Sequence, residues 1–91
     1  MYTIISTAKF QKDLKRIGKR GYRIDSLKEV VGKLAAGEPL DKKHRDHPLK
    51  GDHKGRRECH IAPDWLLIYE VSGETLILLL LRTGTHSDLF E

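Results

Sequence analysis

The fold is decided by residues 57–82, which read RECHIAPDWLLIYEVSGETLILLLLR. Leucine, β-branched and aromatic side chains dominate this stretch, and two turn signals divide it, Pro63-Asp64 and Ser72-Gly73-Glu74. It therefore predicts three consecutive strands, over residues 57–62, 65–71 and 75–82. Strands joined by such short turns pair as an antiparallel meander.

The first turn predicts which residues face each other. If Ala62 lies opposite Trp65, then His60 lies opposite Leu67, because antiparallel partners keep a constant sum of residue numbers. Side chains two positions apart on a strand point to the same face of the sheet. We therefore expect His60 and Trp65 to share one face.

The second turn extends this pattern to the last strand. If Ser72 pairs with Thr75, Arg82 lies opposite Trp65 and joins the same face, subject to any bulge in the second turn. A histidine, a tryptophan and an arginine would then meet at one end of the sheet. The Pro63-Asp64 turn and the chain that follows Arg82 lie beside them.

Two amphipathic helices are predicted between a short strand at residues 2–5 and the meander. The first begins at Ala8 and ends near Gly18 to Gly21, and the second ends before Gly37 and Pro39. Helical spacing relates the apolar residues of each helix. These are Phe10, Leu14 and Ile17 in the first, and Ile24, Leu27, Val30, Val31, Leu34 and Ala35 in the second.

This order of elements, β-α-α-β-β-β, predicts an α+β fold. A helical hairpin would cover one face of a twisted, mainly antiparallel sheet, because the apolar face of each layer must be buried against the other. The opposite face and the rim at its C-terminal end would then form the active cleft.

Residues 41–55 interrupt the apolar pattern and are predicted to form a long loop. Pro48, Gly51 and Gly55 punctuate it, and it carries three of the five histidines. Loops of this length are uncommon in small domains unless they serve a function.

Composition limits the class of protein. With 91 residues, the chain fits one domain spanning residues 1–91. Its 17 Lys and Arg residues outnumber its 13 acids, which favours polyanionic partners. Cys59 is the only cysteine and lies in a strand pattern, so we expect an inert core thiol. Without a basic leader or a long apolar run, a soluble cytoplasmic protein is expected, with no membrane contact.

Two segments together resemble the signature of YafQ-type messenger-RNA interferases, within the RelE/ParE toxin superfamily. They are DHPLKGDHKGRRECHIAPDWLLIYEV, residues 46–71, and LRTGTHSDLF, residues 81–90. The resemblance implies a toxin of a type II toxin–antitoxin pair that cuts messenger RNA in the ribosomal A site without a metal or other cofactor. It assigns the family's functional residues to His47, His60, Asp64, Trp65, Arg82, His86 and Phe90.

The implied reaction needs these types of residue. A base must take the 2′-hydroxyl proton, a cation must stabilise the phosphorane, and an acid must protonate the departing 5′-oxygen. We expect His86 to be the acid and Arg82 the cation. Asp64, with His60 or His47, would supply the base and orient it.

The resemblance also implies RNA contacts and protein partners. Trp65 and Phe90 would stack on bases, although Trp65 also fits a core position and Phe90 also fits a packing anchor for the C-terminus. Apart from the resemblance, basic residues cluster around the loop that carries the histidines, and among them Lys50, Lys54 and Arg56 would contact phosphates. The expected partners are a cognate antitoxin, the ribosome with its messenger RNA, and operator DNA through the antitoxin complex.

Three other interpretations remain open on the sequence. The chain could be a ParE-like inhibitor of DNA gyrase without enzymatic activity, although such an inhibitor has no need of proton-transfer groups. It could be a ribosome-binding or RNA-binding module that uses only its basic surface. His44, His47 and His53 could hold zinc with His60, but the spacing of a closed tetrahedral site is missing.

Overall fold

The computed structural model describes residues 1–53 and 55–90. It confirms the α+β class and the predicted order, and it adds a two-residue strand and a short C-terminal helix. The strands are β1 (Thr3–Ser6), β2 (His47–Pro48), β3 (Arg57–Ala62), β4 (Trp65–Ser72) and β5 (Ile77–Gly84). The helices are α1 (Ala8–Lys19), α2 (Ile24–Ala35) and α3 (His86–Phe90), and the 3₁₀ turns are η1 (Lys42–His44) and η2 (Gly51–His53).

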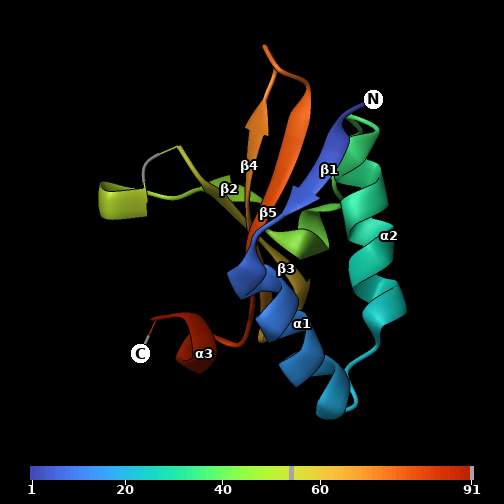
Figure 1. The fold of residues 1–91 in the computed structure, drawn as a ribbon, viewed down its shortest axis with the longest axis vertical. Coiled ribbons are helices and arrows are strands. Elements are labelled where there is room, and N and C mark those ends of the chain that lie inside the picture. The colour runs from blue at the N-terminus through green and yellow to red at the C-terminus, as the bar shows by residue number, and fades with distance from the viewer. Residues whose placement is uncertain (54, 91) are drawn as a thin grey trace.

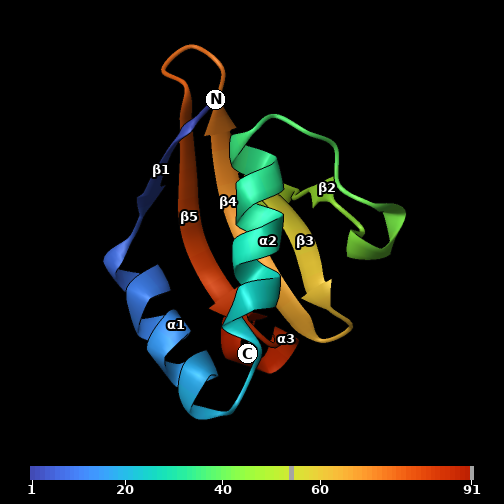
Figure 2. The ribbon, with the colours of Figure 1, turned by 90° about the vertical axis from the view of Figure 1, so that its right-hand side faces the viewer.

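The strands form a single twisted sheet in the order β1-β5-β4-β3-β2. Only β1 is parallel to its neighbour, β5, and the other pairs are antiparallel. Helices α1 and α2 lie on one side of the sheet, while α3 and η2 lie on the other (Figure 1). Figure 2 shows α2 in front of β3 and β4, with α1 beside the lower part of β5.

Local signals account for the bounds of both long helices. The Thr7 side chain accepts a hydrogen bond from the N–H of Phe10 at 3.0 Å, which caps the start of α1. At the end of α2, Gly37 adopts a φ of 76° and Glu38 N–H bonds the Lys33 carbonyl at 3.0 Å. This left-handed glycine terminates the helix and satisfies one of its last carbonyls.

The core lies between the two long helices and the sheet. Phe10 and Ile17 of α1, together with the apolar stripe of α2, pack on alternate residues of the central strands. Those strand residues are Cys59, Trp65, Leu67, Tyr69, Leu78 and Leu80. The expectation that Cys59 is a core residue is confirmed, because it is 0% exposed, and Tyr69 beside it in the core is 1% exposed.

The predicted pairing between β3 and β4 is correct at the turn and wrong beyond it. Ala62 pairs with Trp65 as expected, but His60 pairs with Leu66 and not with Leu67. Ile61 forms a bulge between the two pairs. A single extra residue reverses the face of every side chain that follows. His60 and Trp65 therefore lie on opposite faces of the sheet, and the prediction that they share one face is wrong.

The pairing between β4 and β5 also differs from the prediction. The strand β5 starts at Ile77 rather than Thr75, because residues 73–76 form the turn and Leu76 has a left-handed φ of 56°. A second irregularity leaves Leu81 unpaired, so that Arg82 lies opposite Ile68 and not opposite Trp65. Arg82 thus shares the face of His60 and not that of Trp65.

The segment predicted to be a long loop is more ordered than expected. It contains η1 and η2, and β2 adds a short fifth strand by pairing His47 with Glu58. Tyr69 and Arg57 both bond the carboxylate of Asp46, and these contacts fix the start of β2. Within the described ranges, no helix has the length and apolar character that crossing a membrane requires.

Candidate active site

The candidate site lies on the sheet face opposite α1 and α2. We call this surface the histidine face and define it by Glu58, His60, Leu66, Ile68 and Arg82. Cross-strand pairing puts Glu58, Ile68 and Arg82 in one row and joins His60 to Leu66 in the next. Paired residues project to the same side of a sheet. The two bulges thus bring His60 and Arg82 together on this face.

Two histidines flank a buried carboxylate on this face. The Nε2 atoms of His47 and His60 lie 3.6 Å and 3.9 Å from Oε1 of Glu58, which is 6% exposed. The Nδ1 atoms lie 2.7 Å and 3.3 Å from the carbonyl oxygens of Arg45 and Pro63. A carbonyl can only accept, so each Nδ1 is the donor. In the neutral ring Nε2 is then the nitrogen without a proton, and in both histidines it lies on the side of Glu58.

His86 and Asp64 form a second pair beside the first. Nδ1 of His86 lies 3.1 Å from Oδ1 of Asp64, which also accepts the backbone N–H of His86 at 3.2 Å. These bonds lower the pKa of Asp64, chiefly through the His86 ring. The ring centroids of His86 and His60 are 6.1 Å apart. Asp64, expected to act with His60 or His47, thus contacts His86.

Arg82 is held from α1. Its Nε and Nη2 atoms donate to the two carboxylate oxygens of Asp13, at 2.7 Å and 3.1 Å. The Asp13 side chain raises the pKa of Arg82, so the guanidinium keeps its charge. The site therefore contains a fixed cation beside two sets of proton-transfer groups.

A cleft of about 250 Å³ lies over the histidine face, next to Arg82. Its lining residues are Thr7, Lys9, His53, Arg56, Ile68, Leu81, Arg82 and Leu89. Apolar side chains thus lie beside cationic ones, an arrangement that suits a nucleotide. Phe90 is 44% exposed and its ring lies 6.2 Å from that of His86 and 6.1 Å from that of His53, centroid to centroid. An aromatic surface is therefore available at the rim.

Trp65 is not part of this surface. Its side chain is 3% exposed, packs edge-on against Tyr22 at 5.2 Å between centroids, and donates from Nε1 to Thr83 at 2.9 Å. The expected partial exposure of Trp65 is wrong, because the bulge at Ile61 separates it from His60. In the structure Trp65 fills the core and donates a hydrogen bond to the buried hydroxyl of Thr83.

The predicted phosphate-binding residues differ in their surroundings. Lys50 is exposed, whereas Arg56 lines the cleft and pairs with Glu70 at 3.3 Å. Lys54 lies outside the described residues.

The described residues offer little support for a cysteine nucleophile or for a metal site. Burial raises the pKa of the Cys59 thiol to about 12, so it is unsuited to nucleophilic attack. In the part of the chain that the structure describes, no three His, Cys, Asp or Glu side chains are arranged to hold a metal ion. The four histidines considered for zinc are divided among η1, β2, η2 and β3.

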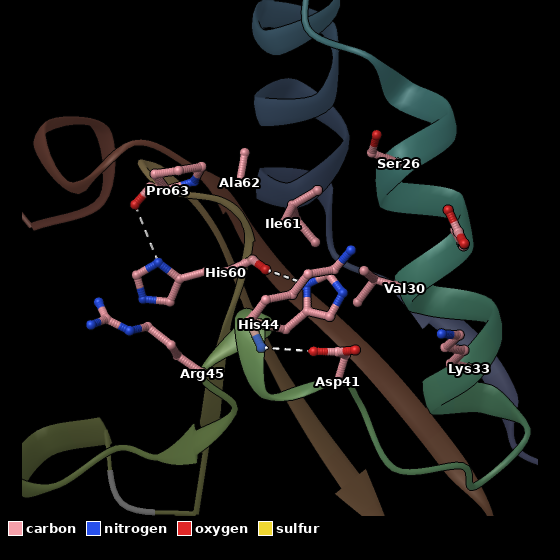
Figure 3. A pocket seen from close by; sticks show the side chains of 12 residues that line it. Ser26, Val30, Lys33, Asp41, His44, Arg45, His60, Ile61, Ala62 and Pro63 are labelled. Atoms are coloured by element: carbon pink, nitrogen blue, oxygen red, sulfur yellow. Dashed lines mark hydrogen bonds between the residues drawn. The ribbon is translucent and has the colours of Figure 1, made fainter.

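A larger pocket of about 580 Å³ lies at the C-terminal end of β3, beside α2 and η1. Figure 3 shows His44 between β3 and α2, while the His60 ring points away from α2. His44 Nδ1 donates to the His60 carbonyl at 2.7 Å and thereby occupies an edge of the sheet. Of the residues that define the histidine face, only His60 lines this pocket.

Sequence reasoning missed two residues of the site, Glu58 and Asp13. Glu58 alternates with His60 along β3, and strand periodicity could have identified it as a neighbour on the same face. Asp13 occupies the apolar stripe of α1, between Phe10 and Ile17 at helical spacing. An acid in such a stripe signals a buried partner, but its identity depends on the fold.

Comparisons with known proteins agree with the resemblance seen in the sequence. The family model described as the bacterial toxin of type II toxin–antitoxin system, YafQ, matches residues 2–91. The mRNA interferase toxin YafQ of Escherichia coli strain K12 is 39% identical over 85 residues, covering 92% of this chain and 90% of that protein.

Two solved structures have the same fold. A metal-bound toxin from Helicobacter pylori superposes with a TM-score of 0.93 at 49% identity, covering 99% of this chain and 100% of that one. YafQ in the E. coli DinJ-YafQ complex gives 0.91 at 37% identity, covering 100% of both chains. The family model spans nearly the whole sequence, and the fold agrees throughout. The chain therefore belongs to the YafQ family of toxins from bacterial type II toxin–antitoxin systems.

Proposed function

We propose that this toxin is an endoribonuclease that cleaves messenger RNA in the ribosomal A site by metal-independent acid–base catalysis. The single observation that carries the proposal is the grouping of His60, His86 and Arg82 on one sheet face. Proton-transfer groups and a cation are what cleavage of RNA by its own 2′-hydroxyl requires. The E. coli relative is named an mRNA interferase, which agrees with this chemistry.

In the proposed reaction, His60 Nε2 takes the proton of the 2′-hydroxyl. The Glu58 carboxylate, which His47 also flanks, stabilises the imidazolium that results. The 2′-oxygen forms a bond to the adjacent phosphorus, and the bond from phosphorus to the 5′-oxygen breaks. His86, held through Nδ1 by Asp64, donates a proton to the departing 5′-oxygen. The products are a 2′,3′-cyclic phosphate and a 5′-hydroxyl, and the cyclic ester can open to a 3′-phosphate.

Arg82 would bind the non-bridging oxygens of the reacting phosphate, because a guanidinium offers several N–H donors in a fixed plane. Phe90 would stack on a base at the rim of the cleft. Lys50 and Arg56 would contact flanking phosphates, and the same role is proposed for Lys54.

The proposed biological setting follows from the family. The relative in the DinJ-YafQ complex is bound to an antitoxin, so a cognate antitoxin is proposed as the partner of this chain. Contact with operator DNA would occur only through that complex. A ribosomal substrate would place the reaction in the cytoplasm.

One experiment tests the reaction and its requirements. Purified toxin is incubated with programmed ribosomes and with naked messenger RNA, each with and without EDTA, and the RNA ends are mapped. We expect cuts confined to the A-site codon, with cyclic-phosphate or 3′-phosphate ends and the same rate in EDTA. His86→Ala serves as the inactive control.

Two results would contradict the proposal. Activity that disappears in EDTA and returns with a divalent metal would make the enzyme metal-dependent, which is relevant because the H. pylori relative was solved with bound metal. Intact message in every reaction, together with inhibition of gyrase supercoiling by the same preparation, would instead favour a ParE-like inhibitor.

A further inference from the structure

Asp13 is a buried carboxylate in the apolar stripe of α1. It is 3% exposed and lies on the same side of the helix as Phe10 and Ile17. A buried charge is costly unless it is paired and hydrogen-bonded. The position would accommodate an apolar residue in an ordinary amphipathic helix, so its contacts require an explanation.

Three of the four hydrogen bonds that Asp13 accepts come from Arg82 and Thr83. Oδ2 accepts hydrogen bonds from Arg82 Nε at 2.7 Å and from the backbone N–H of Thr83 at 3.1 Å. Oδ1 accepts from Arg82 Nη2 at 3.1 Å and from Arg16 Nη2 at 3.0 Å. Four donors thus surround one carboxylate.

Asp13 also completes the edge of the sheet next to Arg82. The strand β1 pairs with β5 only as far as Leu80, and α1 continues along that edge. Thr7 Oγ1 donates to the Leu81 carbonyl at 2.9 Å, and Asp13 accepts the backbone N–H of Thr83, two residues further along β5. The backbone and the side chain of the Arg82 segment are therefore fixed from the same helix.

The geometry of the ion pair determines which donors remain available to a ligand. Asp13 engages the Nε and Nη2 side of the guanidinium. For the residues that the structure describes, no hydrogen bond from Nη1 is found, and the Arg82 side chain keeps 30% exposure at the cleft. The outer edge of the guanidinium, Nη1 and the second hydrogen of Nη2, is left for a phosphate.

We propose that Asp13 is a positioning residue that holds Arg82 so that the outer edge of its guanidinium faces the reacting phosphate. The inference rests on the proposed function, in which Arg82 binds that phosphate. Asp13 does not itself touch RNA. It acts by restricting the rotamers of an otherwise flexible side chain, and catalytic groups depend strongly on such preorganisation.

The first test measures positioning without activity. In ¹⁵N NMR of the wild-type toxin, the Arg82 Nε–H should exchange with water more slowly than that of Arg56, whose ion pair with Glu70 is exposed on both sides. In Asp13→Asn, the Arg82 exchange should approach that of Arg56. Equal exchange of the two arginines in the wild-type protein would overturn the proposal, even if the variant failed to fold.

The second test is a double-mutant cycle on the single-turnover cleavage rate with programmed ribosomes. Asp13→Asn should slow cleavage by about 100-fold while leaving ribosome affinity unchanged. In an Arg82→Ala background the same substitution should change the rate less than about 2-fold, because Asp13 has no further target. If Asp13→Asn slows cleavage by the same factor in the wild-type and Arg82→Ala backgrounds, Asp13 is only a structural residue.

The matched control is Leu34→Ala, which weakens the core from α2, away from the site. It should lower thermal stability without slowing cleavage at a temperature where the protein stays folded. Failure of the proposed function is separately visible: if Arg82→Ala cleaves at the wild-type rate, Arg82 has no phosphate role. If Arg82→Ala is impaired but the losses are independent, only the positioning role of Asp13 is wrong.

Discussion

At the scale of single residues, the key feature is a carboxylate shared by two imidazoles. Glu58 is buried, and it faces Nε2 of both His47 and His60. Because Nδ1 of each ring donates to a carbonyl, Nε2 is the nitrogen that can gain a proton, and the carboxylate beside it stabilises the imidazolium that results. Glu58 thus contributes to the site without touching the substrate in the proposed reaction.

Glu58→Gln should reduce the cleavage rate, because a neutral amide no longer stabilises the imidazolium that forms when His60 takes the proton. We expect a loss of about 10²-fold, at the low end for disrupted acid–base catalysis. The pH–rate profile should change on the limb that reports the base, since Glu58 contacts His60 and not His86. Single-turnover assays across pH provide the measurement.

Glu74→Gln is the matched control, because Glu74 is exposed in the turn between β4 and β5, at the other end of the hairpin. It should cleave like the wild-type toxin. A Glu58→Gln enzyme with an unaltered rate and pH profile would show that Glu58 is not needed to stabilise the protonated histidine.

At the scale of elements, α3 depends on contacts with the rest of the fold. Five residues are too few for a stable isolated helix. Thr85 and Asp88 cap it reciprocally, with the Thr85 N–H donating to Asp88 at 3.0 Å and the Asp88 N–H donating to Thr85 at 3.2 Å. Arg20, which follows the last residue of α1, donates two hydrogen bonds to the same carboxylate, at 2.7 Å and 3.1 Å. The position of His86 therefore depends on Asp88.

Asp88→Asn should loosen α3 and lower the melting temperature at neutral pH by roughly 4–8 °C, a range typical of losing one favourable interaction in a domain of this size. The Arg20 contact holds the pKa of Asp88 well below its usual range. A carboxylate with a lowered pKa stabilises the fold above its unfolded pKa of about 4 and loses that effect as the pH falls. The difference from wild type should therefore shrink between pH 5 and pH 2.

Thermal melts of the wild-type and variant proteins across this pH range provide the measurement, with cleavage assays at neutral pH in parallel. Asp25→Asn, at an exposed position in the first turn of α2, is the control and should show a smaller shift. If the difference in melting temperature between wild type and Asp88→Asn stayed constant down to pH 2, the charge of Asp88 would not be what stabilises α3.

At the scale of the whole molecule, exposed lysines lie in the segment that precedes β3 as well as on α1. The formal net charge is +4. Lys42, Lys43 and Lys50 are exposed in the segment that precedes β3, whereas Arg56 and Arg57 are paired with Glu70 and Asp46. The three lysines are thus the clearest candidates for unneutralised contacts with RNA.

Replacing Lys42, Lys43 and Lys50 together by Gln should weaken ribosome binding and reduce its salt dependence. Each lost phosphate contact lowers the slope of log K against log salt by about one. Binding titrations at several salt concentrations measure this slope. Cleavage within the bound complex should stay near the wild-type rate.

The control is the triple replacement of Lys12, Lys15 and Lys28 by Gln, which removes the same charge from exposed positions on α1 and α2. It should leave the salt slope almost unchanged. Equal effects of the two triple variants would show that net charge, rather than a local surface, determines binding.

The accuracy of the sequence predictions depended on the range of the interactions involved. Strand β3 has the predicted bounds, and α1 begins at Ala8 as expected, because the turn at Pro63-Asp64 and the cap at Thr7 act within a few residues. The predicted register of the meander is wrong from Ile61 onward, one residue beyond the first correctly predicted pair. Bulges respond to packing on both faces of a sheet, which a strand pattern does not contain.

The sequence by itself determined the order of elements, the core stripes and the family, because periodicity, turn residues and motifs are local properties of the chain. Tertiary structure alone decided the composition of the site. The bulges at Ile61 and Leu81 left Trp65 on the core face, while His60 and Arg82 share the other face with Glu58. Asp13 meets Arg82 across 69 positions of sequence. Such a contact forms only when packing brings α1 to the edge of β5, so the sequence pattern of neither segment reveals it.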